Sequence, residues 1–487
     1  MDRMEDIIII GGGVIGCSIA RELSRYRRRV LVLEKNSDVC EGTSKANSGI
    51  VHAGYDALPG TKKAYFNLLG NQCMEELCQE LQVPFSRIGS LVLSPEGKGE
   101  ETLKRLYQQG IRNGVSGLEL ITGERIKAFE QGLAPEITQA LYAPSAGIVC
   151  PFELTIAMAE NAINNGAEIQ LNTCVTKIEK LTRGYCVYAE KNGATQVYKC
   201  DFIINAAGVY ADEFHNMVSK DKILIVPRKG EYCLLDKNSA DLVQHTLFQL
   251  PTEAGKGVLI TPTVHGNILM GPTAEEIEDK EGINTTGAGL NKIMTLTARS
   301  ITGEYKRGII TSFAGLRAHE RGGDFIVEEV KDAPGFIDAA GIDSPGLTCA
   351  PAIGSYIADL MQQIQPAEKK KDFQRTRKGM IHMAELSFAE QERIIKENPQ
   401  YGRIVCRCEQ VTEGEIRDAL HRPLPATTMD GIKRRTRAGM GRCQSGFCTS
   451  RTMELLGDEL KLKQTEIKKN SKQSYQLLGN TKEEGET

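Results

Sequence analysis

The chain has no tryptophan among its 487 residues, and it has no apolar run long enough to cross a membrane. A membrane-spanning helix needs about 20 predominantly apolar residues in a row, so the sequence predicts none. A strong charge excess is missing too, and the formal net charge of -3 argues against nucleic acid as the main partner. The first ten residues, MDRMEDIIII, lack a signal-peptide pattern and favour a cytoplasmic location.

What is present is enough apolar content, 40%, for sizeable cores, and a length that predicts two or three domains. The chain has 14 cysteines, and ten of them show no pairing pattern. Without an export signal, such scattered cysteines indicate reduced and mostly buried thiols. These ten are Cys17, Cys40, Cys73, Cys78, Cys150, Cys174, Cys186, Cys200, Cys233 and Cys349.

The other four cysteines form a spaced group. One residue separates Cys406 from Cys408, and 34 residues later Cys443 and Cys448 follow with four residues between them. Four thiolates from two loops are the ligands that a [2Fe-2S] cluster needs. A tetrahedral zinc site is the competing interpretation, and ordinary thiols are a third.

A glycine signature lies near the other end. Gly11, Gly13 and Gly16 form G-x-G-x-x-G between the apolar run at 6–10, expected to be a buried strand, and a helical pattern at 17–26. Such glycines allow a tight turn, a close approach of backbone to a pyrophosphate, and packing of helix on strand. A second strand, VLVLEK, ends at Glu34 and Lys35, and the acid can accept hydrogen bonds from ribose hydroxyls. The pattern predicts a dinucleotide site. A plain glycine-rich turn with a solvated glutamate is the alternative.

Several segments alternate apolar and polar residues between turn residues, as antiparallel strands do. They lie at 91–97, 140–151, 231–236 and 257–273.

Five further segments, in order, resemble the glycine/D-amino-acid oxidase superfamily of FAD enzymes: 43–54, 169–180, 202–213, 313–320 and 341–355. With the glycine signature they span roughly residues 5–365. The resemblance implies FAD as the dinucleotide. It also implies that FAD contacts lie at Gly11, Gly13, Gly16, Glu34, Lys35, Thr43, Ser44, Asn47, Ser48, Val175, Gly208, Gly315, Gly346, Leu347 and Thr348.

The resemblance further implies an α/β fold, with a Rossmann-like FAD-binding domain over 1–365. An antiparallel-sheet substrate domain is expected to be interleaved with it, roughly at 80–150 and 225–310. A linker and helix at 366–400 would then lead to a small helical [2Fe-2S] domain at 401–460. Within it, Thr412 and Glu415 have capping-box spacing. The polar stretch 461–487 is expected to be disordered.

The chemistry implied is hydride transfer from a substrate C–H bond to flavin. Arg317 is the best candidate for binding a phosphate or carboxylate, because its planar fork suits such anions. Its alternative is a structural ion pair. His52 is expected beside the flavin as a base, since imidazole titrates near neutral pH, although a hydrogen-bonded structural histidine is as plausible. Weaker candidates are His265, His319, Arg228 and Lys229.

Two relatives within the superfamily compete. The stretch 47–64 looks much like L-2-hydroxyglutarate dehydrogenases and oxidases. An FAD module followed by a cysteine domain is similar to the catalytic subunit of anaerobic glycerol-3-phosphate dehydrogenases, although Cys17 and Ser18 depart from that subunit's usual small residues. The segment 406–448 closely resembles the bacterioferritin-associated-ferredoxin-like [2Fe-2S] domain.

We therefore expect an FAD-dependent dehydrogenase for an anionic secondary alcohol, with sn-glycerol 3-phosphate favoured and electrons leaving through the cluster. The alternatives are an L-2-hydroxyglutarate dehydrogenase or oxidase, an amino-acid or amine oxidase, and a non-catalytic electron-transfer subunit. A protein electron acceptor or partner subunits are expected, and such partners could bring the chain to a membrane surface. The basic run at 433–437, with Arg442, would raise the cluster's potential or meet an acidic partner, unless it is only a solvated helix face.

Overall fold

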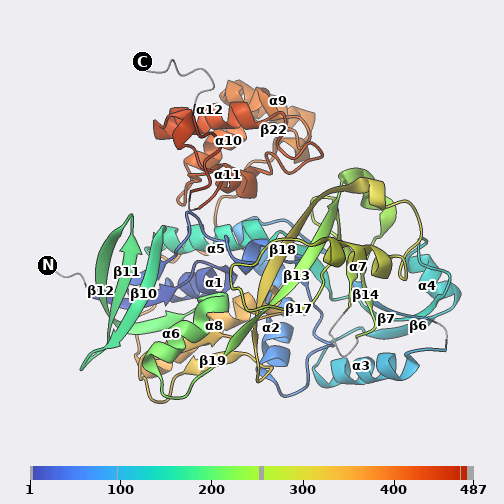
Figure 1. Cartoon of the computed structure of the whole chain (residues 1–487), viewed down its shortest axis with the longest axis horizontal. Coiled ribbons are helices and arrows are strands. Elements are labelled where there is room, and N and C mark those ends of the chain that lie inside the picture. Colours follow the sequence, from blue (N-terminus) through green and yellow to red (C-terminus); the bar gives the residue numbers. More distant parts are fainter. Residues whose placement is uncertain (1–3, 96, 252–256, 472, 480–487) are drawn as a thin grey trace.

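The computed structural model describes residues 4–95, 97–251, 257–471 and 473–479, and it has three parts (Figure 1). Two sheets, each with its own helices, lie side by side in the larger body. A small helical part, drawn in red, sits on the body's upper edge next to α5. No helix among the described residues is long and apolar enough to span a membrane.

The first sheet is built around a parallel core. Strand β1 (Met4–Ile10) pairs in parallel with two neighbours, β2 (Val30–Leu33) and β12 (Ala194–Asn205). The outer parallel strands are β9 (Glu168–Gln170) and β20 (Phe336–Ala340). Ile7 and Ile9 join the apolar core on one face, whereas Ile8 and Ile10 join the core on the other. Both faces are covered, which explains why this strand is apolar throughout.

Helices and a meander complete this part. The helices are α1 (Val14–Leu23), α2 (Lys62–Leu81), α5 (Pro151–Asn164), α6 (Ala211–Val218) and α8 (Gly346–Ile364). Antiparallel strands β10 (Thr173–Lys180) and β11 (Tyr185–Lys191) extend the sheet beyond β12, and β19 (Ile326–Glu329) pairs with β20. The segment 169–180 contributes to two strands, β9 and β10, and Asn172 adopts a left-handed conformation, with φ of 53°, between them.

The second sheet has nine strands. Eight of them follow the order β17-β13-β16-β15-β14-β5-β7-β6, and the ninth, β18, also pairs with β13. Its neighbours are antiparallel except for the pair β5 and β14. The predicted antiparallel sheet is thus confirmed. Its strands are β5 (Ser90–Pro95), β6 (Glu119–Thr122), β7 (Ile137–Ala143), β13 (Ile225–Leu235), β14 (Thr246–Gln249), β15 (Leu259–Pro262), β16 (Ile268–Gly271), β17 (Glu275–Glu276) and β18 (Ile309–Glu320).

Three helices flank this sheet, and a small sheet joins it to the first part. The helices are α3 (Glu100–Arg112), α4 (Glu124–Phe129) and α7 (Gly287–Thr297). The small sheet holds β3 (Ile50–Val51), β4 (Phe85–Arg87) and β8 (Gly147–Val149). One of the predicted strand regions, 140–151, is therefore divided between two sheets.

The helical part has its own apolar core, which includes Ile416, Ile432 and Leu456. Its elements are β21 (Ile404–Cys406), β22 (Val411–Thr412), α10 (Glu413–Leu420), α11 (Met429–Thr436) and α12 (Thr449–Leu460), and α9 (Phe388–Glu397) precedes them. The predicted capping box is present: Thr412 and Glu415 exchange side-chain and backbone hydrogen bonds at the start of α10.

The segment after α12 differs from the expected disorder. Ile467 is fully buried in the core of the helical part. The backbone N–H groups of Met429 and Asp430 donate to the carbonyls of Lys468 and Lys469, at 3.1 and 2.8 Å. The expectation was therefore wrong for 461–471, because one apolar side chain and a few backbone bonds are enough to anchor a polar stretch. Residues 480–487 lie outside the described residues.

Buried ion pairs attach the helical part to the body. Arg435 donates both terminal nitrogens to Asp38, at 2.6 and 2.9 Å, and Arg434 donates to Asp38 and Glu41, at 3.0 and 3.2 Å. All four side chains are buried. The acidic partner of the basic run is thus found within the same chain, and α11 is no solvated helix face.

A second buried group of ion pairs lies at Glu160 on α5. Its carboxylate accepts hydrogen bonds from Arg377 at 2.6 Å and from Arg422 at 2.6 and 3.0 Å. Burial raises the pKa of Glu160, but the two guanidinium groups outweigh it and hold the pKa below its usual range. The connecting stretch, through Arg377, and the helical part, through Arg422, are therefore both held to the body at Glu160.

Candidate active site

A cavity of about 1070 Å³ lies between the two sheets. Residues at the carboxyl ends of β1 and β2 line one side of it, and residues of β13, β14 and β18 line the other. In open parallel α/β sheets, ligands bind outside the carboxyl ends of the strands. Residues of the second sheet enclose further volume next to that position. The cavity therefore has room for a small molecule in addition to a dinucleotide.

The glycine turn has the geometry of a pyrophosphate cradle. Gly11 adopts a φ of +106°, which side chains rarely tolerate, and Gly13 caps α1 without any side-chain hydrogen bond. A Cβ atom on Gly16 would stand 2.0 Å from the Gly11 carbonyl oxygen, so this glycine permits close packing. Gly11 and Gly13 line the cavity and Gly16 does not. The N-terminus of α1 therefore faces the space where an anion would lie.

Glu34 lines the cavity but already accepts three hydrogen bonds. Its carboxylate accepts from the backbone N–H of Gly12 at 2.6 Å and from both nitrogens of Asn36 at 2.8 Å. Burial raises the pKa of Glu34, and the backbone donors only partly offset that effect. Lys35 also lines the cavity, forms an ion pair with Glu281 at 3.0 Å, and lies 3.9 Å from the centre of the Tyr210 ring.

Most of the other residues expected at FAD line the same cavity. The loop after β2 contributes Thr43, Ser44, Asn47 and Ser48, and β10 contributes Val175. Gly208 lies in the turn before α6, Gly315 lies on β18, and Gly346 and Leu347 begin α8. Ser44 accepts the N–H of Val14 at 2.9 Å, which fixes this loop on the first turn of α1. A Cβ on Gly315 would stand 2.1 Å from the carbonyl oxygen of Ala46, so β18 meets the loop closely.

Thr348 lies outside the cavity wall and holds His52. Its hydroxyl accepts the backbone N–H of His52 at 3.0 Å and donates to the carbonyl of Ile50 at 3.3 Å. The amides of Asn67 and Asn71 donate to the His52 carbonyl, at 2.8 and 2.9 Å. His52 itself lines the cavity, with its ring 5.7 Å from that of Phe248. Three hydrogen bonds therefore fix the backbone of this histidine.

Arg317 points its charge at the cavity from β18. Its Nη2 donates to the carbonyl of Thr273 at 2.9 Å, and it also hydrogen-bonds Tyr232. Within the described ranges no carboxylate forms an ion pair with Arg317, whereas its cross-strand neighbour Arg228 pairs with Glu276 at 2.8 Å. Arg317 thus offers an unneutralised positive charge at the cavity wall.

The sequence motifs did not single out Lys63 and Asp343, which form one network with His319. Lys63 Nζ lies 2.7 Å from Asp343 Oδ1, and His319 Nδ1 lies 3.1 Å from Asp343 Oδ2. All three line the cavity. Burial raises the pKa of Asp343, but His319 and Lys63 outweigh it and hold the pKa below its usual range. Lys63 falls in the stretch 47–64 that carries the family resemblance, and that was the available signal.

Only two of the four weaker candidates for substrate binding lie at the cavity. His319 and Arg228 line the cavity. Lys229 is buried with Nζ 3.8 Å from Glu231, and His265 lies elsewhere, 3.1 Å from Glu153.

The four spaced cysteines meet as two pairs. Cys408 Sγ lies 3.6 Å from Cys443 Sγ, and Cys448 hydrogen-bonds Cys406 and lowers the pKa of Cys406 to about 6. Cys406 and Cys448 are buried, and Cys408 is exposed. Among the described residues, no three of these sulfurs lie within 4.8 Å of one another. A single zinc ion with bonds of about 2.3 Å would draw all four closer than that. The two pairs suit two irons. The ten other cysteines, all described, are also free thiols.

Family models match two regions of the chain. Residues 6–360 match "FAD dependent oxidoreductase", and residues 404–458 match "BFD-like [2Fe-2S] binding domain". The two regions contain the cavity-lining residues and the four cysteines, respectively.

Whole relatives are also similar. The chain is 49% identical to a glycerol 3-phosphate dehydrogenase of Caloramator mitchellensis over 482 residues, 99% of this chain and 100% of that protein. It is 32% identical to a glycerol 3-phosphate oxidase of Mycoplasma genitalium, over 73% of this chain and 94% of that protein. An L-2-hydroxyglutarate dehydrogenase of Escherichia coli K12 is 28% identical over 63% of this chain and 76% of that protein.

Among solved structures, the FAD-bound L-alpha-glycerophosphate oxidase of Mycoplasma pneumoniae superposes with a TM-score of 0.73 at 30% identity. It covers 77% of this chain and 98% of its own length. A glycerol-3-phosphate dehydrogenase of Bacillus halodurans superposes over 95% of this chain and 92% of its own, with a TM-score of 0.67. At 15% identity the second likeness concerns the fold alone.

Proposed function

Because this chain belongs to the family of FAD-dependent oxidoreductases and carries a [2Fe-2S]-binding domain, we propose that it oxidises sn-glycerol 3-phosphate to dihydroxyacetone phosphate. The family, the fold class and both cofactors predicted from the sequence are thereby confirmed. The proposal concerns the substrate, the residues that handle it, and the route by which electrons leave.

One observation carries the choice of substrate. The similarity to the Caloramator mitchellensis glycerol 3-phosphate dehydrogenase extends through both domains, over 99% of the chain. The similarity to an L-2-hydroxyglutarate dehydrogenase is weaker and covers 63% of the chain. The two-domain layout therefore goes with the glycerol 3-phosphate relative.

The charges at the cavity suit a phosphate ester. Arg317 has no carboxylate partner among the described residues, and its guanidinium can donate two parallel hydrogen bonds to phosphate oxygens. His319 and Lys63 stand in one network with Asp343, which carries a negative charge that they share. We assign Arg317 to the substrate phosphate, with the His319–Asp343–Lys63 network beside it.

Oxidation of the secondary alcohol removes a hydride from C2 and a proton from its hydroxyl group. FAD, when bound along the glycine turn, supplies the hydride acceptor. His52 is the proposed acceptor of the hydroxyl proton, because it lines the cavity and its backbone is fixed by Thr348, Asn67 and Asn71. An imidazole held in this way can accept a proton as a general base.

Electrons are proposed to leave at the exposed edge of the cysteine site. A bound [2Fe-2S] cluster supplies a one-electron acceptor there. Cys408 is exposed, the Phe447 side chain next to Cys448 is 89% exposed, and Arg407 and Arg442 are exposed beside them. An exposed aromatic side chain and two exposed arginines, each next to a cysteine in the sequence, suit a protein partner with an acidic surface. We therefore propose that the electron acceptor docks at this edge.

Two alternatives make different predictions. An L-2-hydroxyglutarate dehydrogenase would use the same cations for a carboxylate. A non-catalytic subunit that only passes electrons on would need no space for a substrate next to the flavin. The contribution of the second sheet to the cavity, through Tyr232, Phe248 and Arg317, favours an enzyme over a relay.

The test is anaerobic reduction of the purified holoprotein, followed by the loss of flavin absorption near 450 nm. We expect bleaching by sn-glycerol 3-phosphate, and none at equal concentration by sn-glycerol 1-phosphate or L-2-hydroxyglutarate. Bleaching by L-2-hydroxyglutarate alone would replace this proposal with the first alternative. Full-length protein that carries FAD and is bleached by dithionite, but by no hydroxy or amino acid substrate, would support the relay.

A further inference from the structure

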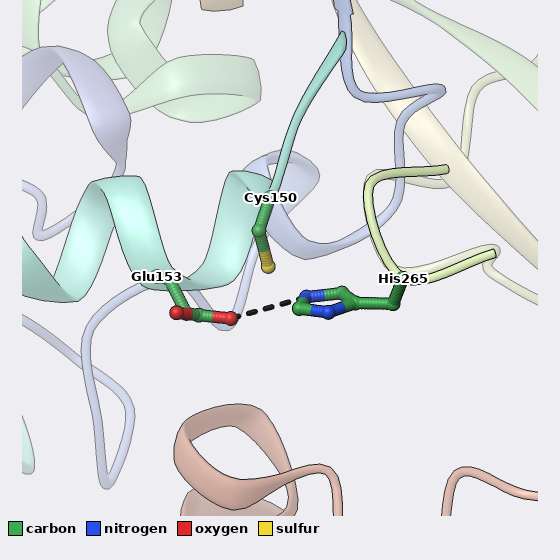
Figure 2. Close-up of side chains that lie close together, drawn as sticks. All are labelled: Cys150, Glu153 and His265. Carbon is green, nitrogen blue, oxygen red and sulfur yellow. Dashed lines mark hydrogen bonds and ion pairs between the residues drawn. The ribbon is translucent and has the colours of Figure 1, made fainter. Parts of the chain in front are cut away.

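Three side chains with metal-binding atoms meet outside the cavity and outside the cysteine site. Cys150 Sγ, a carboxylate oxygen of Glu153 and a ring nitrogen of His265 all lie within 4.8 Å of one another. Figure 2 shows the thiol and the carboxylate projecting from the start of α5 towards the imidazole, which comes from the turn between β15 and β16. The function proposed above uses none of them.

A fourth ligand-type residue stands at the edge of this group. His382 Nε2 lies 3.6 Å from the second carboxylate oxygen of Glu153, while His265 Nε2 lies 3.1 Å from the first. His382 belongs to the stretch that connects the body with the cysteine domain. The group therefore joins three parts of the fold: α5, the β15–β16 turn and the connecting stretch.

The site is shielded from solvent. The side chains of Glu153 and His265 are 7% and 6% exposed, Cys150 is 3% exposed, and His382 is 16% exposed. Burial without a further partner is costly for a carboxylate, and both oxygens of Glu153 here face imidazole nitrogens. Two ion pairs would account for the histidines and the glutamate, but they give no role to the thiol.

The thiol enters the same space from the start of α5. Cys150 is the N-cap residue of that helix and makes no side-chain capping hydrogen bond, and burial together with the Glu153 carboxylate raises the pKa of the thiol. A bound cation reverses this effect, because a thiol that coordinates a metal is deprotonated. The sulfur therefore offers a further ligand atom to the space that the carboxylate and imidazoles enclose.

One thiolate, one carboxylate and neutral imidazoles form a donor set typical of zinc, which takes four such ligands at about 2.0–2.3 Å in a tetrahedron. With one thiolate and one carboxylate, a divalent ion leaves the buried site with no net charge. Four protein ligands would leave no open position for a substrate, which is the pattern of a structural site. The ligand atoms of Cys150, Glu153 and His265 lie within 4.8 Å of one another. His382 lies outside this group of three, with Nε2 3.6 Å from Glu153, and its side chain would have to turn towards the group to complete the shell.

We propose that Cys150, Glu153 and His265 bind one zinc ion, with His382 as the fourth ligand, and that this ion fastens the connecting stretch to the body. On binding, the Cys150 S–H bond breaks, the proton passes to solvent, and a bond forms between sulfur and zinc. No electron is transferred. The site is separate from the four cysteines of the [2Fe-2S] domain.

The experiment uses anaerobically purified holoprotein with its FAD, iron and sulfide contents verified. Zinc content is measured by plasma mass spectrometry, and the zinc shell by X-ray absorption at the zinc edge. We expect about one zinc per chain, with one sulfur and three nitrogen or oxygen neighbours. A shell of four sulfurs would place the zinc in the cysteine domain and overturn the proposal. So would the absence of bound zinc after dialysis against a zinc-buffered solution.

Matched variants test the ligands. Cys150→Ser should reduce zinc content at least tenfold, while Cys186→Ser, at another buried thiol on β11, should leave it unchanged. His382→Gln, at the more exposed edge, should weaken zinc retention against a chelator without loss of FAD. Equal zinc in Cys150→Ser and Cys186→Ser would refute the site. The shell of the unmodified protein tests the assignment even if a variant does not fold.

Discussion

Replacement of Asp38 by asparagine tests how the cysteine domain is held on the body. Asp38 is buried and accepts three hydrogen bonds from Arg434 and Arg435, which are buried too. Burial raises the pKa of Asp38, but the two arginines outweigh it and hold the pKa below its usual range. Asp38→Asn keeps the shape and removes the charge, so that Glu41 alone must balance two guanidinium groups.

The expected loss of free energy follows from the burial of Asp38 and its two arginine partners. Removal of one partner from a buried ion pair costs about 3–5 kcal/mol, because it leaves a charge without compensation. In a docking equilibrium that cost corresponds to roughly a hundred-fold or more. The matched control is Glu397→Gln, in the exposed pair with Arg393, where the two side chains are 65% and 64% exposed. An exposed i,i+4 pair contributes only about 0.3–0.5 kcal/mol.

Two measurements follow the effect. Cleavage of the connecting stretch 366–400 by a dilute protease should speed up in Asp38→Asn and stay unchanged in Glu397→Gln. Substrate should still bleach the flavin of Asp38→Asn, whereas reduction of the iron–sulfur absorption should slow. Identical cleavage and identical cluster reduction in both variants would show that the buried arginines do not hold the domain.

The remaining predictions concern the cofactor sites and acid stability. Gly13→Val should place a side chain against the pyrophosphate and abolish FAD binding, and a variant that retains stoichiometric flavin would contradict the cradle. Arg317→Ala loses charged hydrogen bonds of roughly 1.5–3 kcal/mol, so KM for anionic substrates should rise about ten- to a hundred-fold. An equal rise for neutral analogues would remove its anion role. Cys443→Ser should eliminate the cluster's visible absorption and spare flavin reduction by substrate, and retained absorption would exclude Cys443 as a ligand. The pKa of Glu160 is held down by Arg422 and Arg377 against burial, so its contribution to stability is present above its unfolded pKa of about 4.3 and is lost as pH falls below that value. Thermal unfolding between pH 6 and pH 3 should therefore depend less steeply on pH in Glu160→Gln, and an unchanged slope would refute this linkage.

Local pattern was enough to predict the first strand, the glycine turn and the cysteine site. Four consecutive isoleucines followed by Gly11 allow little but a buried strand and a tight turn, and the capping box at Thr412 needs only three residues of spacing. The antiparallel sheet followed from alternation in the same way. These features are set by residues that lie close together in the chain.

What the sequence did not reveal depends on residues far apart. The buried partners of Arg434 and Arg435 stand almost 400 positions away, so a basic helix looked like a solvated face. In the group of Cys150, Glu153 and His265, the histidine lies 112 positions after the glutamate. Cys150 had no cysteine at a characteristic spacing that could single it out. Ile467 was a lone apolar residue in a polar stretch, and only the core it enters explains it.

The loop after β2 has two neighbours at once. On one side Glu41, Thr43 and Ser44 line the cavity, and on the other Asp38 and Glu41 hold α11. A group that orders this loop from the cavity side also orders the seat of the cysteine domain, and thermodynamic linkage makes the effect equal in both directions. We therefore expect flavin affinity and attachment of the domain to be coupled, so that flavin loaded first should favour the attached state of the cysteine domain.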